Sequence, residues 1–519
     1  MDRLHQYLDL VKRRGELGRS VGSADFLIEY LGQEFFMLPP ADVYSVDFVA
    51  GKFYRQLSEW GQRVRSTSRA QELDVLVEYA YLLQKVQMIE SFLGVIRYLV
   101  CQLPSIPEES LGKMFRLFRL AFLVGGDVSL LRLMWQVDAE VLSYVTLPQT
   151  IHQTLPADLQ DAITVGESAD EQVFDRHNSL AGVRRCLATL DGQLTDEQYQ
   201  GLSLNQAALE KDPARYAEQL NHLFGSFGLS GVSSVDFTSD NVLSSLRAPT
   251  PDCGIDDQGL VSIIVSCFNA EDTVGYALSS LRNQTYRNVE ILVCDDGSED
   301  NSLPQILTHA ALDSRIKVFR SLKNQGTYNI RNALIHESKG QYITFHDSDD
   351  WAHPQKLEEQ LVFMAEEGLE VCSARWIRVD PAGAAVFFVD GRAYRFCVVS
   401  TMVKRSVFSV VPRFRPSLVA ADTEFHASCV KLLGESRVQI LNKPLLLGLW
   451  GEGSLTRAEG LKAENNGYVA ERRRRYSEIS ARQQVLGSQI VTDEDVVDVL
   501  KENGIYRAFS GVEAVVANQ

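Results

Sequence analysis

The chain has 519 residues, of which 45% are hydrophobic and 23% charged, so we expect a folded globular protein with more than one domain. Its formal net charge of -17 excludes a general nucleic-acid-binding role, because neutralising phosphates requires a basic face. The 8 cysteines form no CxxC pair, which argues against a zinc site or a disulfide framework and favours a reducing, cytoplasmic environment.

The first 245 residues are predicted to form an all-α amino-terminal domain. Apolar residues recur at helical spacing in segments 4–11, 26–36, 73–100, 111–123 and 130–145. One more helix is expected over residues 213–227. No fixed repeat period is evident, so an α-solenoid is one possible arrangement of these helices and not a specific prediction.

Membrane insertion is not expected from the sequence. No apolar core follows a basic start, and charged residues interrupt the most apolar region, residues 75–103. We therefore expect neither a signal peptide nor a transmembrane helix, and at most peripheral membrane contact.

A linker is predicted over residues 246–258, where Pro249, Pro251 and Gly254 interrupt any regular element. Beyond it, four short apolar runs are typical of buried parallel strands, at residues 261–266, 289–294, 316–319 and 341–345. Three of these strands end in polar or acidic residues. Because ligands bind at the carboxyl edge of an open parallel sheet, we expect a binding site there.

Acidic residues gather after the second and fourth strands. Asp295 and Asp296 alone could form a turn, but Asp347, Asp349 and Asp350 exceed what one helix cap needs. Clustered carboxylates repel one another unless a cation joins them, and hard oxygen ligands suit Mg²⁺ or Mn²⁺. A metal site that also holds substrate phosphates is the favoured interpretation.

Taken together, these motifs resemble the donor half of the family 2 glycosyltransferases, which have the GT-A fold. The matching residues are Ser266, Phe268 and Asn269 after the first strand, Asp295 to Ser298 after the second, Gly326, Arg331 and Asn332 in the third loop and its helix, and Asp347, Asp349 and Asp350 after the fourth. Four motifs in this order are more specific than any one of them. The resemblance extends over about residues 258–456.

The resemblance implies roles for individual residues. The donor-binding residues would be Ser266, Phe268, Asn269, Asp296, Arg331, Asp347 and Asp349, and the metal ligands Asp347, Asp349 and Asp350. Phe268 would stack on the nucleobase, Asp296 would contact the base, and Arg331 would face the donor diphosphate. In the acceptor half, Asp422 matches the position of the family's catalytic base, with Glu424 as the backup.

The implied architecture is an α/β GT-A domain with a Rossmann-like, mostly parallel sheet over residues 259–456. It would follow the all-α domain and precede a helical extension, residues 457–519. That extension contains the run from Arg472 to Arg475, which could meet anionic lipid, although a solvated helix face is the favoured interpretation. After the acidic loop we also expect a helix over residues 354–368, strands over 370–379, 385–389 and 441–449, and a helix that opens near Ala420.

The implied function is a metal-dependent, inverting glycosyltransferase of the hexosyltransferase type (EC 2.4). The donor would be a nucleoside-diphosphate sugar, with UDP favoured, and the acceptor a saccharide, glycoconjugate or lipid-linked sugar of bacterial surface polysaccharide biosynthesis. Such an enzyme would work in the cytoplasm at the inner face of the membrane.

One departure from the family pattern supports a rival hypothesis. Many relatives carry a metal-ligating His where this chain has Gly451, so water or Glu452 would have to complete the metal shell. A non-catalytic scaffold with a decayed transferase domain is therefore the alternative, although Asp349, Asp350 and Asp422 are all retained. A sugar-nucleotide pyrophosphorylase is disfavoured, because its Gly-rich opening with Arg and Lys is absent after Val265.

Overall fold

We describe the protein from a computed structural model. It describes residues 176–190, 192–387, 391–451, 471–486 and 491–515, with short stretches before residue 176. The five helical segments predicted between residues 4 and 145 lie almost entirely outside this part. The chain divides into two compact units, one of them Ser168–Asn465 with Leu500–Gln519 and the other Met1–Glu167 with Asn466–Val499.

Little of the second of these units is described. It contains β1 (Thr146–Leu147) and β2 (Thr164–Val165), which pair in parallel, together with α9 (Ala157–Gln160) and α20 (Glu471–Leu486). The arginine run lies on α20, and the strand pair was not predicted. None of the described helices is long and apolar enough to span a bilayer.

The unit that starts at Ser168 is built on a nine-stranded sheet with the strand order β11-β5-β4-β3-β6-β9-β8-β10-β7. Its first half is β3 (Val261–Cys267), β4 (Val289–Asp295), β5 (Ile316–Arg320) and β6 (Tyr342–Asp347), all parallel. The connecting helices are α15 (Val274–Arg282), α16 (Ser302–Leu312) and α17 (Thr327–Glu337). This half confirms the four predicted strands and their shared carboxyl edge.

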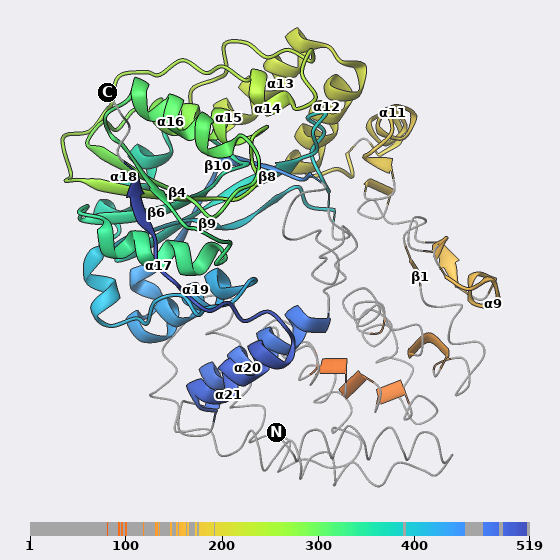
Figure 1. Cartoon of the computed structure of the whole chain (residues 1–519). Helices are drawn as coiled ribbons and strands as arrows, with labels where there is room; N and C mark the ends of the chain where they lie inside the picture. The colour runs from red at the N-terminus through yellow and green to blue at the C-terminus, as the bar shows by residue number, and fades with distance from the viewer. Residues whose placement is uncertain are drawn as a thin grey trace, which may run out of the picture. The chain divides into compact units, whose positions relative to one another are not determined.

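The second half comprises β7 (Trp351–Ala352), α18 (Lys356–Glu366), β8 (Val371–Val379), β9 (Tyr394–Lys404), η4 (Arg405–Ser409), α19 (Ala421–Leu433), η5 (Glu435–Arg437) and β10 (Val438–Leu449). Figure 1 shows α15 and α16 on one side of the sheet and α17 and α19 on the other. The α/β architecture is therefore confirmed for this domain.

The expectation of a mostly parallel sheet was wrong for the second half. β9 pairs antiparallel with both β6 and β8, and β7 pairs antiparallel with β10. β9 follows β8 without a crossover helix, and a connection of that kind makes neighbouring strands antiparallel. The strand predicted over residues 385–389 is reduced to a single bridge at Ala385, with residues 388–390 outside the described part.

The helical extension was also only partly correct. α21 (Asp493–Glu502) is a helix, but the chain then forms β11 (Glu513–Val515), which pairs antiparallel with β5 at the edge of the sheet. Residues 503–515 therefore belong to the same compact unit as the donor half.

Helices before the predicted linker belong to the same compact unit as this sheet. They are α11 (Leu180–Thr189), α12 (Asp196–Glu210), α13 (Pro213–Ser226) and α14 (Val242–Ser245). Tyr216 of α13 donates a hydrogen bond to the carbonyl of Gly383 (2.9 Å), and the Phe224 ring lies 4.8 Å from the His353 ring. The linker predicted over residues 246–258 lies inside this unit.

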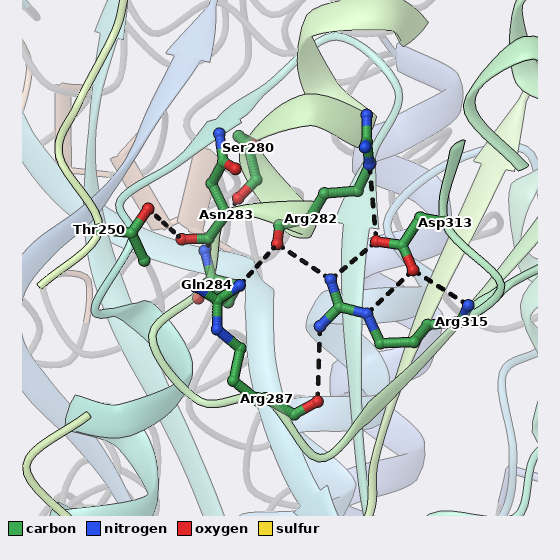
Figure 2. A network of polar contacts seen from close by, with 8 residues as sticks. All are labelled: Thr250, Ser280, Arg282, Asn283, Gln284, Arg287, Asp313 and Arg315. Atoms are coloured by element: carbon green, nitrogen blue, oxygen red, sulfur yellow. Dashed lines mark hydrogen bonds and ion pairs between the residues drawn. The ribbon is translucent and has the colours of Figure 1, made fainter. Parts of the chain in front are cut away.

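A polar network holds the opposite, amino-terminal end of the parallel strands (Figure 2). Arg315, just before β5, donates to Asp313 from Nε (3.0 Å) and Nη2 (2.7 Å), and to the carbonyl of Arg282 (3.0 Å). The carbonyl of Arg287 accepts a weaker bond from Arg315 at 3.4 Å. This end is occupied by internal partners, which leaves the carboxyl edge as the candidate site.

We predict that Phe224→Ala destabilises the sheet-containing unit. Phe224 is fully buried against Trp351 and His353, so removing its ring should cost about 3–5 kcal/mol and lower the Tm. Thermal unfolding followed by aromatic circular dichroism measures this, with Phe509→Ala as the control because Phe509 is 52% exposed. Unchanged melting of the sheet would instead support the domain boundary predicted at residues 246–258.

Candidate active site

Three carboxylates meet where β6 ends. Asp347, Asp349 and Asp350 each offer an oxygen atom, and these oxygens lie within 4.8 Å of one another. The Asp347 side chain is 34% exposed, whereas Asp350 is only 2% exposed and its Oδ2 has no hydrogen-bond partner in the structure. A buried carboxylate oxygen without a partner, beside two other carboxylates, is a site that a divalent cation would satisfy.

The acidic turn is fixed by hydrogen bonds from α15, β6 and β10. Tyr276 of α15 donates to the carbonyl of Asp349 (2.5 Å), and His346 Nε2 bonds the carbonyl of Asp350 (3.1 Å). The amide of Leu449 in β10 donates to Asp350 Oδ1 (3.2 Å). Burial lowers the pKa of His346 to about 3, so His346 is neutral and structural.

The electrostatics of the turn favour protonation while no cation is bound. Burial, followed by the neighbouring charge of Asp347, raises the pKa of Asp349 to about 7. Burial, followed by the neighbouring charges of Asp349 and Asp347, raises the pKa of Asp350 well above its ordinary value. A bound divalent cation would reverse this, because it stabilises the ionised form of every ligand.

Sequence reasoning missed a cation beside the cluster. The Arg378 guanidinium on β8 lies 4.1 Å from the centre of the Trp376 ring and 4.8 Å from that of Trp450, and its charge opposes the rise in the pKa of Asp350. A β-carbon at Gly448 would lie 2.7 Å from the Trp376 ring, so this glycine leaves room for the ring. The sequence could have indicated this pair, because Trp376 and Arg378 are two positions apart on β8 and therefore lie on one face of the strand.

Arg331 pairs with one of the three aspartates. It is 2% exposed, and its Nη2 donates to Asp347 Oδ1 at 2.7 Å. Its guanidinium carbon also lies 5.3 Å from the centre of the Phe345 ring. In this structure Arg331 therefore orients Asp347. The neighbouring Asn332 is structural, since its side chain bonds the backbone of Phe414 twice.

Asp296 lies at the carboxyl end of β4 and is nearly covered. Its Oδ1 accepts from the amide of Gln325 (2.9 Å) and its Oδ2 from the amide of Gly326 (2.8 Å). Burial raises the pKa of Asp296 to about 6, against the effect of these two bonds. Asp296 thus joins β4 to the loop before α17.

Three residues at the carboxyl end of β3 differ in whether the protein itself occupies their side chains. Ser266 donates to Thr327 Oγ1 (3.1 Å), and Asn269, at φ 46°, accepts from the amide of Glu299 through Oδ1 (3.0 Å). Phe268 is 44% exposed, so one part of its ring stays open at the edge of the sheet. Of the three, Phe268 is the side chain available to stack on a ligand.

The two candidate bases lie on the first turn of α19 and differ in their partners. Glu424 is buried and forms an ion pair with Arg415 at 2.5 Å. Asp422 is partly exposed, and its described bond is the one that Oδ1 accepts from the amide of Thr423 (2.8 Å). Glu424 is thus buried and occupied by Arg415, whereas Asp422 is the more accessible carboxylate.

Within the described residues, the potential metal ligands are the three aspartates alone. Gly451 is described and half-buried, whereas Glu452, the suggested substitute for the missing His, lies outside the described residues.

Comparisons with known proteins agree with this geometry. Residues 262–393 match the sequence profile of Glycosyl transferase family 2. An uncharacterized glycosyltransferase of Haemophilus influenzae is 32% identical over 187 residues, which are 34% of this chain and 74% of that protein. The Escherichia coli UDP-Glc:alpha-D-GlcNAc-diphosphoundecaprenol beta-1,3-glucosyltransferase WfgD is 41% identical over 113 residues, 22% of this chain and 44% of WfgD.

Among solved structures, the crystal structure of S. aureus TarS 1–349 in complex with UDP-GlcNAc aligns with a TM-score of 0.35 and 19% sequence identity. The alignment covers 46% of this chain and 71% of that one.

We predict that Asp349→Asn stabilises the metal-free protein. The folded-state pKa lies above the ordinary 3.8, so the wild type loses stability as pH rises from about 3.8 to about 7 and stays at that lower stability above it. In chelator at pH 8 the variant should therefore have a higher Tm than wild type. The difference should be roughly 2–4 °C for each kcal/mol of unfolding free energy that the substitution restores, and it should be smaller at pH 5.

Adding Mn²⁺ should then raise the Tm of wild type but leave that of Asp349→Asn almost unchanged. The exposed Asp252 provides the matched control, since Asp252→Asn should respond to Mn²⁺ as wild type does. Equal Mn²⁺ responses of wild type and Asp349→Asn would contradict a metal site at this turn.

Proposed function

The chain belongs to glycosyl transferase family 2, and on that basis we propose that it moves a sugar from a nucleoside-diphosphate donor to an acceptor hydroxyl in a single, inverting displacement. The observation that carries the proposal is the cluster of Asp347, Asp349 and Asp350 at the carboxyl edge of the parallel strands. In a glycosyltransferase with such a cluster, the donor diphosphate would lie beside the three aspartates.

The three aspartates would hold Mg²⁺ or Mn²⁺, which supplies neutralising charge for the leaving nucleotide. Arg331 fixes the direction of Asp347 through their ion pair, so one ligand is oriented before the cation arrives. Arg378 adds a positive charge on the β8 side and helps to balance the charge that develops on the leaving diphosphate.

The nucleotide would lie over the ends of β3 and β4. Phe268 offers an open aromatic surface for the base, and Asp296 supplies acceptor oxygens for the base or ribose. Ser266 and Asn269 act through the loops that they hold, as their hydrogen bonds to Thr327 and Glu299 indicate.

Asp422 would serve as the general base. A base for this displacement must take the proton of the acceptor hydroxyl from the side opposite the leaving diphosphate. The carboxylates of the acidic turn are committed to the cation, and Glu424 is committed to Arg415. Asp422 lies in the first turn of α19 and is partly exposed, so an acceptor hydroxyl can reach it.

The names of relatives support a finer assignment. WfgD and WfaP of Escherichia coli are named as enzymes that use UDP-Glc and a GlcNAc-diphosphoundecaprenol acceptor. We extend this to a UDP-sugar donor and a lipid-linked acceptor of bacterial surface polysaccharide biosynthesis. Such an acceptor would require action at the inner face of the membrane.

The proposal predicts metal-dependent nucleotide release. The purified chain should release UDP from a UDP-sugar in Mn²⁺ or Mg²⁺, faster when a polyprenyl-diphosphate-linked sugar is supplied, and not in chelator. UDP-Glc, UDP-GlcNAc and GDP-Man form a first donor panel, with Asp350→Asn as the inactive control. Release that is equal in wild type and Asp350→Asn would exclude this site, and binding without any release would favour the scaffold hypothesis.

The assignment of the base makes a second prediction. Asp422→Asn keeps the size and most hydrogen bonding of the side chain but cannot take a proton, so transfer should fall by about 10²–10⁴. Nucleotide affinity measured by calorimetry should stay unchanged, because the residue faces the acceptor. Glu424→Gln is the comparison, and a dead Glu424→Gln enzyme beside an active Asp422→Asn enzyme would reverse the assignment.

A further inference from the structure

The C-terminal segment, residues 503–515, lies against the donor half of the domain. Its last three residues pair with β5, with Glu513 opposite Arg320. Nearer its start, the amide of Arg507 donates to the carbonyl of Pro416 (3.0 Å), and the amide of Leu418 donates to the carbonyl of Ile505 (2.9 Å). The segment therefore connects the edge of the sheet to the loop that leads into α19 and Asp422.

The same segment fixes the loop that contacts Asp296. Gln325 accepts from the amide of Ser510 (2.5 Å) and donates to the carbonyl of Gly511 (2.6 Å), and Asn329 donates to the carbonyl of Arg507 (2.9 Å). The amides of Gln325 and Gly326 are the ones that bind the Asp296 carboxylate. The position of Asp296 thus depends on residues more than 180 positions later in the chain.

Arg507 brings a positive charge to this place. A β-carbon at Gly326 would lie 3.5 Å from Arg507 Cγ, and the Arg507 charge lowers the pKa of Asp296 against the effect of burial. The Arg507 side chain is exposed, and its described hydrogen bonds involve only its backbone. Its guanidinium is available to a ligand that reaches Asp296.

We propose that Arg507 is a specificity-determining residue for the donor nucleobase, donating a hydrogen bond to a keto oxygen of the base beside Asp296. This inference rests on the proposed function, since it needs a nucleotide at the ends of β3 and β4. It adds a contact from outside residues 262–393, the part of the chain that matches the family profile.

The chemistry of the pair selects one kind of base. A guanidinium only donates and a carboxylate only accepts, so together they match an edge where an imide N–H stands next to a carbonyl oxygen. Uracil and guanine have that edge. With Asp296 opposite the ring nitrogen and Arg507 opposite the neighbouring exocyclic atom, cytosine and adenine do not fit. They place an acceptor nitrogen against the carboxylate and an amino group against Arg507.

The test is calorimetry of the full chain with UDP, GDP, CDP and ADP in Mn²⁺. Wild type should bind UDP or GDP more tightly than CDP and ADP. Arg507→Gln should weaken the preferred nucleotide by about ten- to a hundredfold, the range of a hydrogen bond to a charged group, and change CDP and ADP little. Arg287→Gln is the matched control, because the exposed Arg287 side chain donates only one 3.3 Å bond, before β4 at the other end of the strands.

The outcomes separate this inference from the proposed function. If wild type binds none of the four nucleotides, the proposed function fails and the inference fails with it. If wild type binds UDP or GDP and Arg507→Gln keeps the same affinities in the same order, only the role of Arg507 is overturned. Matching Tm values of the two variants and wild type confirm that the comparison concerns binding and not folding.

Discussion

The repulsion among three carboxylates at the end of β6 is the constraint on which the rest of the domain depends. Each group would be stable in water, but here Asp350 is buried and its neighbours are within 4.8 Å. Such a turn survives only when hydrogen bonds from neighbouring residues hold it and positive charge lies nearby. Tyr276, His346 and Leu449 provide the first, and Arg331 and Arg378 the second.

Both arginines are held by aromatic rings as well as by charge. Arg331 lies within 6 Å of the rings of Tyr328, Phe345 and Phe414, and Arg378 lies near the rings of Trp376 and Trp450. Aromatic faces attract a cation without neutralising it, so the guanidinium keeps its full charge for the carboxylates. Arg331 therefore orients Asp347, Arg378 adds a nearby positive charge, and the cluster still has negative charge that a divalent cation can balance.

Local sequence pattern predicted the first half of the sheet well. β-branched apolar runs that end in acidic residues predicted β3 to β6, and the order of motifs predicted the carboxylate cluster. What it could not predict were contacts between distant segments. The antiparallel insertion of β9, the aromatic partners of Arg378 and the pairing of Arg331 with Asp347 are decided by tertiary packing. The short β11 carries no periodicity, so a helical cap was expected in its place.

The two edge strands of the sheet have a consequence for solubility. At one edge stands β11 with three residues and at the other β7 with two. Long flat edges are templates on which another chain can add a strand, and short ones are a common protection against it. By covering most of β5, the C-terminal segment also protects the central sheet from edge-to-edge association. Loss of that segment would therefore expose β5 and promote aggregation.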